Sequence, residues 1–584
     1  MSRTDTRVDI ARPGWFWTGV VLSCAGVLLH LPMYFAMRAR DHDMAGMDMS
    51  GSAMSGHPMP GSGMDGMGAG SSAAMVAGMV LLVVGLVAAV YGLVRHRPSD
   101  EAASRAGRYR VVPGPQDRLS PAHRRLIAAI SLALIIDVMK PATLAFIIPG
   151  MREEYGISAP EAAWLPVGAL AGTIIGSIVW GWLADRLGRR ATILLSSLMF
   201  ITTTVCAVMP TFAWNIVMCV GMGAAAGGLL PVAYALMAES MPTRQRSVIM
   251  VLQAGLATVA AYFFTSALAA LMIPVFGWRV MWLVHFPFAV AIVLVNRWIP
   301  ESPRFLLRYG RITEAERIVA DYRMVLVDDG LPAGPDGAPA DATGPGGGGA
   351  ARPVSGAPAP QAKEGALAAL FGRRMLVKSL VVGAYALSWS VVNWGFMTFL
   401  PTLMGKAAGG RVLPLSSLLA IPGTALVAYL YARWSSRRTM VLSGAVTVLA
   451  LLALAALGRA DAGLGSYLPL ALLLVGTSGV IATLAPYAAE IYPTDVRGAA
   501  GGYVAACSKT GGLFAPPLIG LLLAHYPGMR VIALCAAAPM ALATLAIALK
   551  GRETAGRDLE EVRAEPPVAV SRAADGLAEP AGIA

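Results

Sequence analysis

Apolar residues gather along this chain in runs of about 20, and short polar segments separate the runs. A run of that length crosses the hydrocarbon core of a bilayer as a helix, because each helical residue adds about 1.5 Å. Two runs stand at the front of the chain, and two groups of six follow. The pattern predicts fourteen membrane-spanning helices, near residues 15–37, 73–94, 126–149, 161–182, 192–209, 213–237, 248–272, 278–298, 376–400, 412–431, 439–457, 467–488, 498–522 and 530–549.

The composition supports a lipid environment. Only 14% of the residues are charged, against roughly 25% in a typical soluble domain. Hydrophobic residues make up 56%, and the mean hydropathy is +0.63. A chain of 584 residues with so few charges cannot cover a water-exposed surface. The composition therefore excludes a soluble enzyme and a soluble nucleic-acid-binding protein.

The basic residues are distributed unequally between the two sides of the predicted membrane. When the spans alternate from a cytoplasmic N-terminus, most of the 46 Lys and Arg residues fall in cytoplasmic segments. This is the positive-inside pattern, and it places both termini in the cytoplasm. It also explains the net charge of +12 without a nucleic-acid partner. We expect a multi-pass protein of a bacterial inner (plasma) membrane, surrounded by the lipid bilayer.

Composition also divides the chain into segments. Residues 328–365 are rich in Pro, Gly and Ala without periodicity, which is typical of a disordered linker. The expected segments are a cytoplasmic N-terminus (1–14), a two-helix extension (15–94) with an outer loop (38–72), a basic cytoplasmic linker (95–125), an N-terminal six-helix half (126–300), a cytoplasmic loop (301–375) that contains the disordered linker (328–365), a C-terminal six-helix half (376–549) and a disordered cytoplasmic tail (550–584).

A short repeat relates the two groups of six spans. The pattern A-E-x-x-P-T-x-x-R occurs at 238–246 and again at 489–497, an offset of 251 positions. The same offset carries Asp185 and Arg186 onto Ser436 and Arg437, in the loop between the second and third spans of each group. Two loops with one offset indicate a duplicated bundle. Secondary transporters use duplicated halves, with the substrate site near the membrane midplane between them.

Two cytoplasmic loops carry distinctive motifs. Residues 181–190 read G-W-L-A-D-R-L-G-R-R, and residues 300–307 read P-E-S-P-R-F-L-L. The basic residues of the first loop have a simpler alternative role, which is to anchor a short loop on the cytoplasmic side. The first motif nevertheless resembles the signature loop of the major facilitator superfamily. The second resembles the PESPRxL segment of its sugar-porter-like, metabolite:proton symporter branch, and the resemblance covers about 126–325 and 370–550.

The resemblance implies an all-α integral membrane protein with a 12-helix body of two pseudo-symmetric halves, to which this chain adds two N-terminal helices. It implies alternating access, in which the halves rock about a central site while charged cytoplasmic loops hold one state closed. The residues that match these gating loops are Gly181, Asp185, Arg186, Gly188, Arg189, Glu239, Arg246, Glu301, Arg304, Glu490 and Arg497.

Three ionisable residues lie inside predicted spans. A charged side chain costs roughly 2.5–3.5 kcal/mol at the centre of a spanning helix, so such residues are functional candidates. Asp137 and Lys140 stand three positions apart on one helix face, and Lys509 comes from the opposite half. One interpretation is that Asp137 and Lys140 only neutralise each other. The other assigns proton coupling to all three, with Lys509 alternating between Asp137 and an anionic substrate.

One position departs from the pattern of the resembled family. Cys219 stands in the fourth span of the main body, where related chains carry a buried arginine. The familiar acid/arginine pair for proton coupling is therefore incomplete. A uniporter or an exchanger stays open beside a symporter.

Polar and aromatic residues on the expected cavity helices are candidates for substrate contact. Aromatic faces with an amide suit a small organic solute, such as an aromatic or carboxylated one. Each residue has an alternative role in helix packing or lipid contact, and we interpret His285 as a packing residue. The candidates are Gln253, Trp389, Asn393, Trp394 and Tyr487.

The outer loop of the extension is rich in methionine and histidine. Thioethers are soft ligands that select Cu(I), and imidazole can complete such a site. The alternative is a loop of biased composition without a ligand. The candidate metal ligands are His42, Met44, Met47, Met49, Met54, His57, Met59, Met64 and Met67.

These observations lead to one functional expectation and two alternatives. We expect a secondary active transporter that carries a small solute, such as a sugar or an organic acid, together with a proton, as a monomer and without a required cofactor. The alternatives are a copper-linked transporter, in which Met218, Cys219 and Met222 continue the pathway, and a metal-responsive membrane protein. The chain shows no Walker loop and no catalytic constellation, so we expect no enzyme activity.

Overall fold

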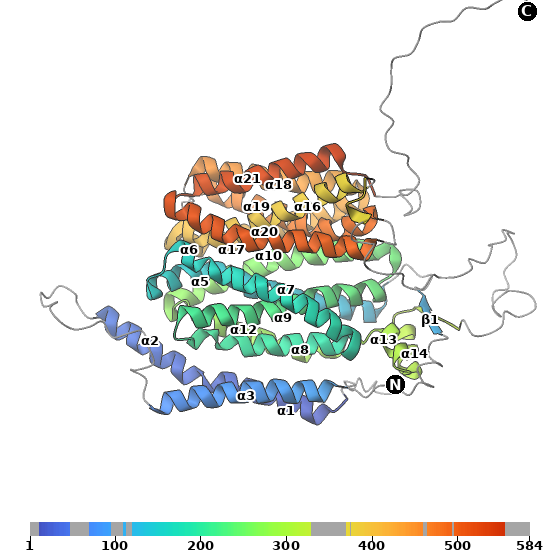
Figure 1. The fold of residues 1–584 in the computed structure, drawn as a ribbon, viewed down its shortest axis with the longest axis horizontal. Coiled ribbons are helices and arrows are strands. Elements are labelled where there is room, and N and C mark those ends of the chain that lie inside the picture. Colours follow the sequence, from blue (N-terminus) through green and yellow to red (C-terminus); the bar gives the residue numbers. More distant parts are fainter. Residues whose placement is uncertain are drawn as a thin grey trace, which may run out of the picture.

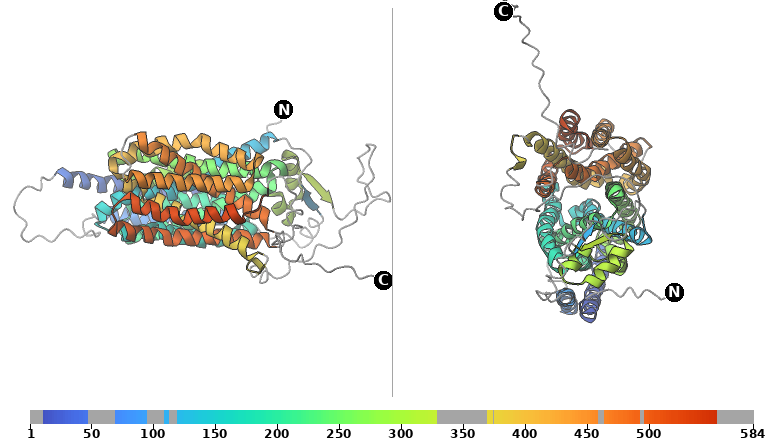
Figure 2. Two further views of the ribbon diagram at one scale, coloured as in Figure 1. Left: turned by 90° about the horizontal axis from the view of Figure 1, so that it is seen from above. Right: turned by 90° about the vertical axis from the view of Figure 1, so that its right-hand side faces the viewer.

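The computed structural model describes residues 11–46, 69–94, 109–112, 119–328, 369–373, 375–458, 464–492 and 496–554. These residues contain fourteen helical segments long and apolar enough to cross a membrane, which confirms the predicted number and order. The helices run side by side as an elongated bundle (Figures 1 and 2). The predicted all-α membrane body is thus confirmed.

The extension consists of three helices on one flank of the bundle: α1 (Pro13–Leu29), α2 (Leu31–Gly46) and α3 (Ala69–Leu93). α1 and α3 pack through glycines, since a Cβ at Gly19 would lie 2.4 Å from the carbonyl oxygen of Gly85. The pair then contacts α8 of the N-terminal half, on the side away from the C-terminal half (Figure 1). α2 continues helically to Gly46, beyond the start of the expected loop at 38.

The N-terminal half begins with a capped helix. Ser120 accepts a hydrogen bond from the backbone N–H of His123 and so caps the first turn of α5. That helix ends at Gly156, whose φ of 63° suits a glycine. The half contains α5 (Pro121–Tyr155), α6 (Ala159–Ala162), α7 (Trp164–Leu187), α8 (Arg189–Thr202), η2 (Thr203–Val208), α9 (Phe212–Ser240), α10 (Thr243–Phe276), α11 (Val280–Leu283), α12 (His285–Val295) and η3 (Asn296–Trp298).

The C-terminal half packs against the N-terminal half through several helices. α10 lies against α17 and α19, α5 lies against α17, and α20 lies against α6 and α7. The seventh span of the main body contains a π-helical segment, η4, between two α-helices. The half contains α16 (Leu376–Ser390), η4 (Val391–Phe396), α17 (Met397–Arg433), α18 (Ser436–Leu457), α19 (Leu464–Ile491), α20 (Arg497–His525) and α21 (Met529–Lys550).

A small cap at one end of the bundle was not expected from the sequence. It contains β1 (Tyr109–Val112), α13 (Pro303–Arg308), α14 (Ile312–Asp321) and β2 (Val325–Asp328). The two strands pair antiparallel, with Val111 opposite Leu326. Val111 also packs into an apolar cluster with Leu306 and Val319. The expected linker 95–125 therefore contributes a strand to the cap, and we call this end of the bundle the cap end. The opposite end, where α2 emerges, is the far end (Figure 2).

Two expected disordered segments fall mainly outside the described residues: 329–365 and 555–584. The expected tail begins at 550, but residues 551–554 are described and contact the C-terminal half. Thr554 is buried. The ordered part of the C-terminal half thus extends past the last span.

Candidate transport site

A cavity of about 430 Å³ lies between the two halves. α5, α7, α9 and α10 of the N-terminal half form one wall, and α16, η4, α17, α19 and α20 of the C-terminal half form the other. The lining is mostly apolar, with a few polar side chains among alanines, glycines and prolines. Such a cavity suits a small organic ligand that is oriented by few polar contacts.

The cavity brings together one acid and one base from opposite halves. Asp137 of α5 and Lys509 of α20 both line it, and their charges interact. Asp137 is 6% exposed, and its Oδ1 has no hydrogen-bond partner among the described residues. A carboxylate without a donor in an apolar wall needs a proton, a cation or a ligand to compensate its burial.

Lys140 points away from this cavity. Its Nζ donates to the Phe200 carbonyl and, at 2.6 Å, to Thr203 Oγ1 of η2, and it lies 4.9 Å from the centre of the Phe200 ring. Lys140 is fully buried but is not among the cavity-lining residues. It forms no ion pair with Asp137 within 4.0 Å, although the two charges interact electrostatically.

The structure brings three of the five substrate candidates to the cavity. Trp389, Asn393 and Trp394 line it, and the indole N–H of Trp389 is fixed on the Thr477 carbonyl at 2.9 Å. The π-helical segment η4 carries Asn393 and Trp394. Such π-helical segments are frequent at functional sites.

The other two candidates are engaged elsewhere. Gln253 donates to the Ile127 carbonyl and to Ser131 Oγ, each at 3.0 Å. The Tyr487 hydroxyl donates to the Arg552 carbonyl at 2.9 Å. Neither lines the cavity. His285 contacts the Met281 carbonyl and Thr143, as a packing histidine does.

Sequence reasoning missed two tyrosines of the N-terminal wall. Tyr234 of α9 and Tyr262 of α10 line the cavity. Tyr234 lies close enough to Asp137 for the two groups to interact electrostatically. A tyrosine inside an apolar span offers a hydroxyl on an aromatic face, and this signal was available in the sequence.

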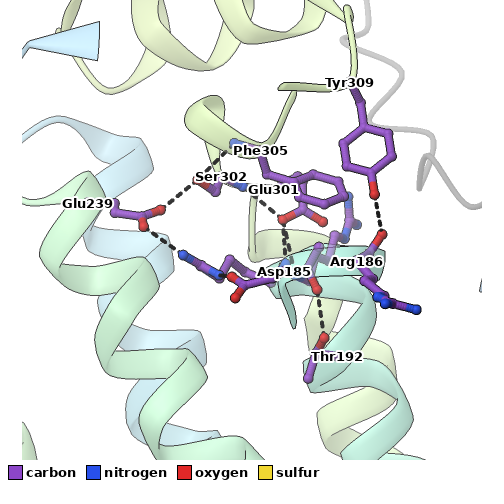
Figure 3. A network of polar contacts seen from close by, with 11 residues as sticks. Asp185, Arg186, Thr192, Glu239, Glu301, Ser302, Phe305 and Tyr309 are labelled. Atoms are coloured by element: carbon purple, nitrogen blue, oxygen red, sulfur yellow. Dashed lines mark hydrogen bonds and ion pairs between the residues drawn. The ribbon is translucent and has the colours of Figure 1, made fainter. Parts of the chain in front are cut away.

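The gating residues of the N-terminal half form a network at the cap end (Figure 3). Arg189 pairs with Asp185 at 3.2 Å and with Glu239 at 2.9 Å. Glu239 also accepts from the Ser302 hydroxyl at 2.6 Å. The network therefore joins α7, α8, α9 and the start of α13.

Glu301 holds the N-terminus of α8. It accepts from the backbone N–H of Arg189 at 2.6 Å and from that of Ser302 at 2.9 Å. Gly188 has a φ of 101°, and a Cβ there would lie 2.2 Å from Glu301 Oε2. Burial raises the pKa of Glu301 to about 7, although these N–H groups and Arg190 favour its charged form. Glu301 lies outside the membrane-spanning segments.

The remaining gating residues stand around this network. The Arg186 carbonyl accepts from the Tyr309 hydroxyl at 2.7 Å (Figure 3). Gly181 is exposed. Burial and the nearby charge of Arg304 lower the pKa of Arg246. The side chain of Arg497 lies outside the described residues.

The C-terminal half carries a second network that sequence reasoning found only in part. Glu490 accepts from the Tyr431 hydroxyl at 3.0 Å and from that of Thr554 at 2.5 Å. Glu553 accepts from the backbone N–H of Ser436 at 2.9 Å. The repeat offset of 251 carries Glu301 onto Arg552, one position before Glu553, so the repeat points to this segment but not to the acid itself.

The proposed metal ligands cannot be placed from the described side chains. His42 and Met44 belong to α2, but the structure does not describe their side chains. The remaining candidates, Met47, Met49, Met54, His57, Met59, Met64 and Met67, lie outside the described residues altogether. Among the residues that are described, no group of three or more His, Cys, Asp or Glu side chains could hold a metal ion.

Comparison with known proteins decides the family. Residues 126–516 match the Major Facilitator Superfamily. The chain belongs to this superfamily. The fold is similar to that of the xylose transporter XylE of E. coli, solved in an inward-open conformation. The TM-score is 0.57 at 14% identity, over 75% of this chain and 98% of that one.

The sequence is also similar to those of known transporters. The niacin transporter NiaP of Acinetobacter baylyi is 24% identical over 75% of this chain and 96% of its own length. The 4-hydroxybenzoate transporter PcaK of the same organism is 31% identical over 33% of this chain and 42% of its own length. The protein is therefore a multi-pass secondary transporter of small solutes and not an enzyme.

Proposed function

We propose that the protein carries a small organic acid across the bacterial inner membrane together with a proton. The observation that carries the proposal is the placement of Asp137 and Lys509 on opposite walls of one largely apolar cavity. Each half contributes one of the two charges. The site therefore changes when the halves move relative to each other.

Lys509 supplies the charge that a carboxylate needs. The indole of Trp394 packs 3.0 Å from a Cβ built at Gly512, which is one turn along α20 from Lys509. An aromatic side chain thus packs against the helix that carries Lys509, with the Asn393 amide on the same helix segment as the indole. A planar acid can place its carboxylate at Lys509 and its ring against Trp394.

Asp137 supplies the proton step. When Asp137 is charged, it attracts Lys509 and competes with a substrate carboxylate for that cation. When Asp137 takes up a proton, Lys509 is released for the substrate. Binding of proton and acid then favour each other, which is the requirement for symport.

The names of the relatives agree with this chemistry. Niacin, 4-hydroxybenzoate and cis,cis-muconate are organic acids, and transporters named for them are among the relatives. A sugar needs several free hydrogen-bonding side chains, whereas Thr173 and Thr258 of the wall already donate to carbonyls of their own helices. Lys509 is the one cation among the lining residues, and a carboxylate suits it. An organic acid is therefore the better fit.

The two cap-end networks act as gates in this proposal. The cap and both termini lie in the cytoplasm, as the distribution of Lys and Arg predicts. The networks around Glu239 and Glu490 close the cytoplasmic side in one state and open in the other. One chain contains both halves and the whole cavity, so a monomer is the transporting unit.

Uptake into proteoliposomes tests the proposal. Purified full-length protein is given labelled nicotinate, 4-hydroxybenzoate or xylose, with the pH lower outside. We expect one of the acids to accumulate and xylose to stay at the level of empty vesicles. Lys509→Gln should raise the KM for the acid at least tenfold, whereas Lys378→Gln, at the start of α16 and outside the cavity lining, should not. Transport of xylose alone would contradict the proposed substrate class.

The copper-linked alternative concerns the outer segment. Cu(I) titration of the full chain, with and without its methionines at 44–67 changed to leucine, tests whether this segment binds metal. Uptake that requires Cu(I) would favour the alternative.

A further inference from the structure

The extension precedes the matched family region, which begins at residue 126. Its helix α2 nevertheless contacts the body at the far end of α10. α10 lines the cavity with Ala257, Thr258 and Tyr262. A segment added to the transporter thus reaches one of its cavity helices directly.

Two side chains of α2 make this contact. Tyr34 and Arg38 stand four positions apart and so project from one helix face. The Tyr34 hydroxyl donates to the Phe276 carbonyl at 2.7 Å, and Arg38 Nη2 donates to the Val275 carbonyl at 2.5 Å. The Arg38 guanidinium also lies 4.9 Å from the centre of the Phe276 ring.

These carbonyls belong to the last two residues of α10. The last four carbonyls of a helix find no N–H donor within the helix, so their hydrogen bonds must come from elsewhere. A basic side chain is also favoured at a helix C-terminus, where the helix dipole is negative. The backbone N–H of Gly277 bonds the Ile273 carbonyl at this helix end, and α2 supplies donors for the Val275 and Phe276 carbonyls.

The residues directly after the C-terminus of α10 contact α5. The Trp278 indole N–H donates to Glu154 Oε2 at 2.7 Å, and Arg279 pairs with Glu154 at 2.5 Å. A Cβ at Gly150 would lie 2.5 Å from the Trp278 ring, so the indole packs directly on α5. The five consecutive residues 275–279 thus join α2, α10 and α5.

We propose that Tyr34 and Arg38 are positioning residues for transport, because they cap α10 and thereby fix the far ends of α10 and α5 to each other. α5 carries Asp137, and α10 forms the neighbouring part of the same wall. With the hydrogen bonds from Tyr34 and Arg38 in place, α5 and α10 move as one unit when the halves rock. Without it, the Val275 and Phe276 carbonyls take up water and the 275–279 turn loosens from α5.

Hydrogen–deuterium exchange of the full-length protein in nanodiscs tests the contact between α2 and the C-terminus of α10 without any substrate. Removing both donors with Tyr34→Phe and Arg38→Met should raise exchange in peptides covering 270–282 about tenfold. Arg12→Met is the matched control, because Arg12 contacts Tyr91 within the extension. Unchanged exchange in the double variant, or an equal rise in the control, would overturn the proposal. Should the double variant not fold, Arg38→Met alone gives the same test with about a threefold rise.

Uptake of labelled nicotinate tests the positioning role and rests on the proposed function. The double variant should lower the maximal rate about fivefold while KM stays within about twofold, and Arg38→Lys, which keeps a donor, should recover most of the rate. A normal rate or a changed KM alone would contradict the positioning role. If the unaltered protein carries no acid, the proposed function fails, whereas the exchange measurement still decides whether the cap exists.

Discussion

In each half, a glutamate carboxylate holds the N-terminus of the third spanning helix at the cap end. These helices are α8 and α18. In the N-terminal half, Glu301 accepts from the backbone N–H of Arg189 at the start of α8. In the C-terminal half, Glu553 accepts from that of Ser436 at the start of α18. A carboxylate at a helix N-terminus meets free N–H groups and the positive end of the helix dipole. The duplicated bundle has kept this arrangement in both copies.

The donors around the second acid of each network differ. Glu239 accepts from the Arg189 guanidinium and the Ser302 hydroxyl. Glu490 accepts from the hydroxyls of Tyr431 and Thr554. The acceptors are thus shared, while a charged donor in one half is replaced by a neutral one in the other. We infer that charge and salt affect the N-terminal network more strongly than its counterpart.

The largest effect is expected from removing the shared carboxylates. Glu301→Ala and Glu553→Ala each leave backbone N–H groups of a buried helix start without an acceptor, which costs about 3 kcal/mol of unfolding free energy. Nicotinate uptake should fall more than tenfold in both. Thermal unfolding and uptake measure the two effects. A silent Glu553→Ala beside a damaging Glu301→Ala would break the correspondence between the halves.

A pH effect at Glu301 of the N-terminal half comes next. The pKa of Glu301 is raised to about 7 from its ordinary 4.5, so the folded protein favours the protonated acid. Its contribution to stability is therefore full below about pH 4.5 and is lost as pH rises through about 7, by up to about 3 kcal/mol.

Glu301→Gln mimics the neutral acid and should remove this decline. Melting temperatures at pH 5 and pH 8 measure it, with exposed Glu316→Gln as the control. Equal pH dependence in Glu301→Gln and the unaltered protein would show that Glu301 does not titrate in this range.

A smaller effect distinguishes the residues that precede the two helix starts. Gly188→Ala places a Cβ against Glu301 at a φ that side chains rarely adopt, which costs about 2 kcal/mol. Ser435→Ala removes only a hydroxyl cap on the Arg438 N–H and a contact to Glu553, worth about 1 kcal/mol. Chemical denaturation measures both. A larger loss in Ser435→Ala would reverse this part of the comparison.

The smallest effect on stability concerns the exposed ion pair. Asp185 has a side-chain exposure of 67%, so Asp185→Asn should cost less than about 1 kcal/mol. Turnover should nevertheless slow, by about threefold, and the difference should shrink in 1 M salt because screening weakens the pair in the unaltered protein too. Tyr431→Phe, which removes a neutral donor to Glu490 in the other half, should show no such salt dependence. Unchanged turnover in Asp185→Asn would remove its gating role.

The fold of the membrane body followed from the sequence because each span is long and apolar. Fourteen runs and one repeat offset were enough to predict two groups of six helices and an extension. The cap did not follow, because β1 and β2 have only four residues each and their partners lie far apart in the chain. The contact of Tyr34 with Phe276 likewise depends on tertiary packing alone.

The candidate site was only partly predictable for a related reason. Asp137, Lys509, Asn393 and the two tryptophans reach the cavity, whereas Gln253 and Tyr487 face other helices. A spanning helix that is apolar all round gives no periodic signal for the face that points inward. Polarity therefore selected the right helices more reliably than the right side chains.

Acid accumulation driven by a pH gradient in Asp137→Asn proteoliposomes tests the central claim most directly. The account predicts that this variant loses accumulation against a gradient, since the amide cannot carry the proton, while exchange of labelled for unlabelled acid persists. Full accumulation by Asp137→Asn at the rate of the unaltered protein would contradict proton coupling at this site.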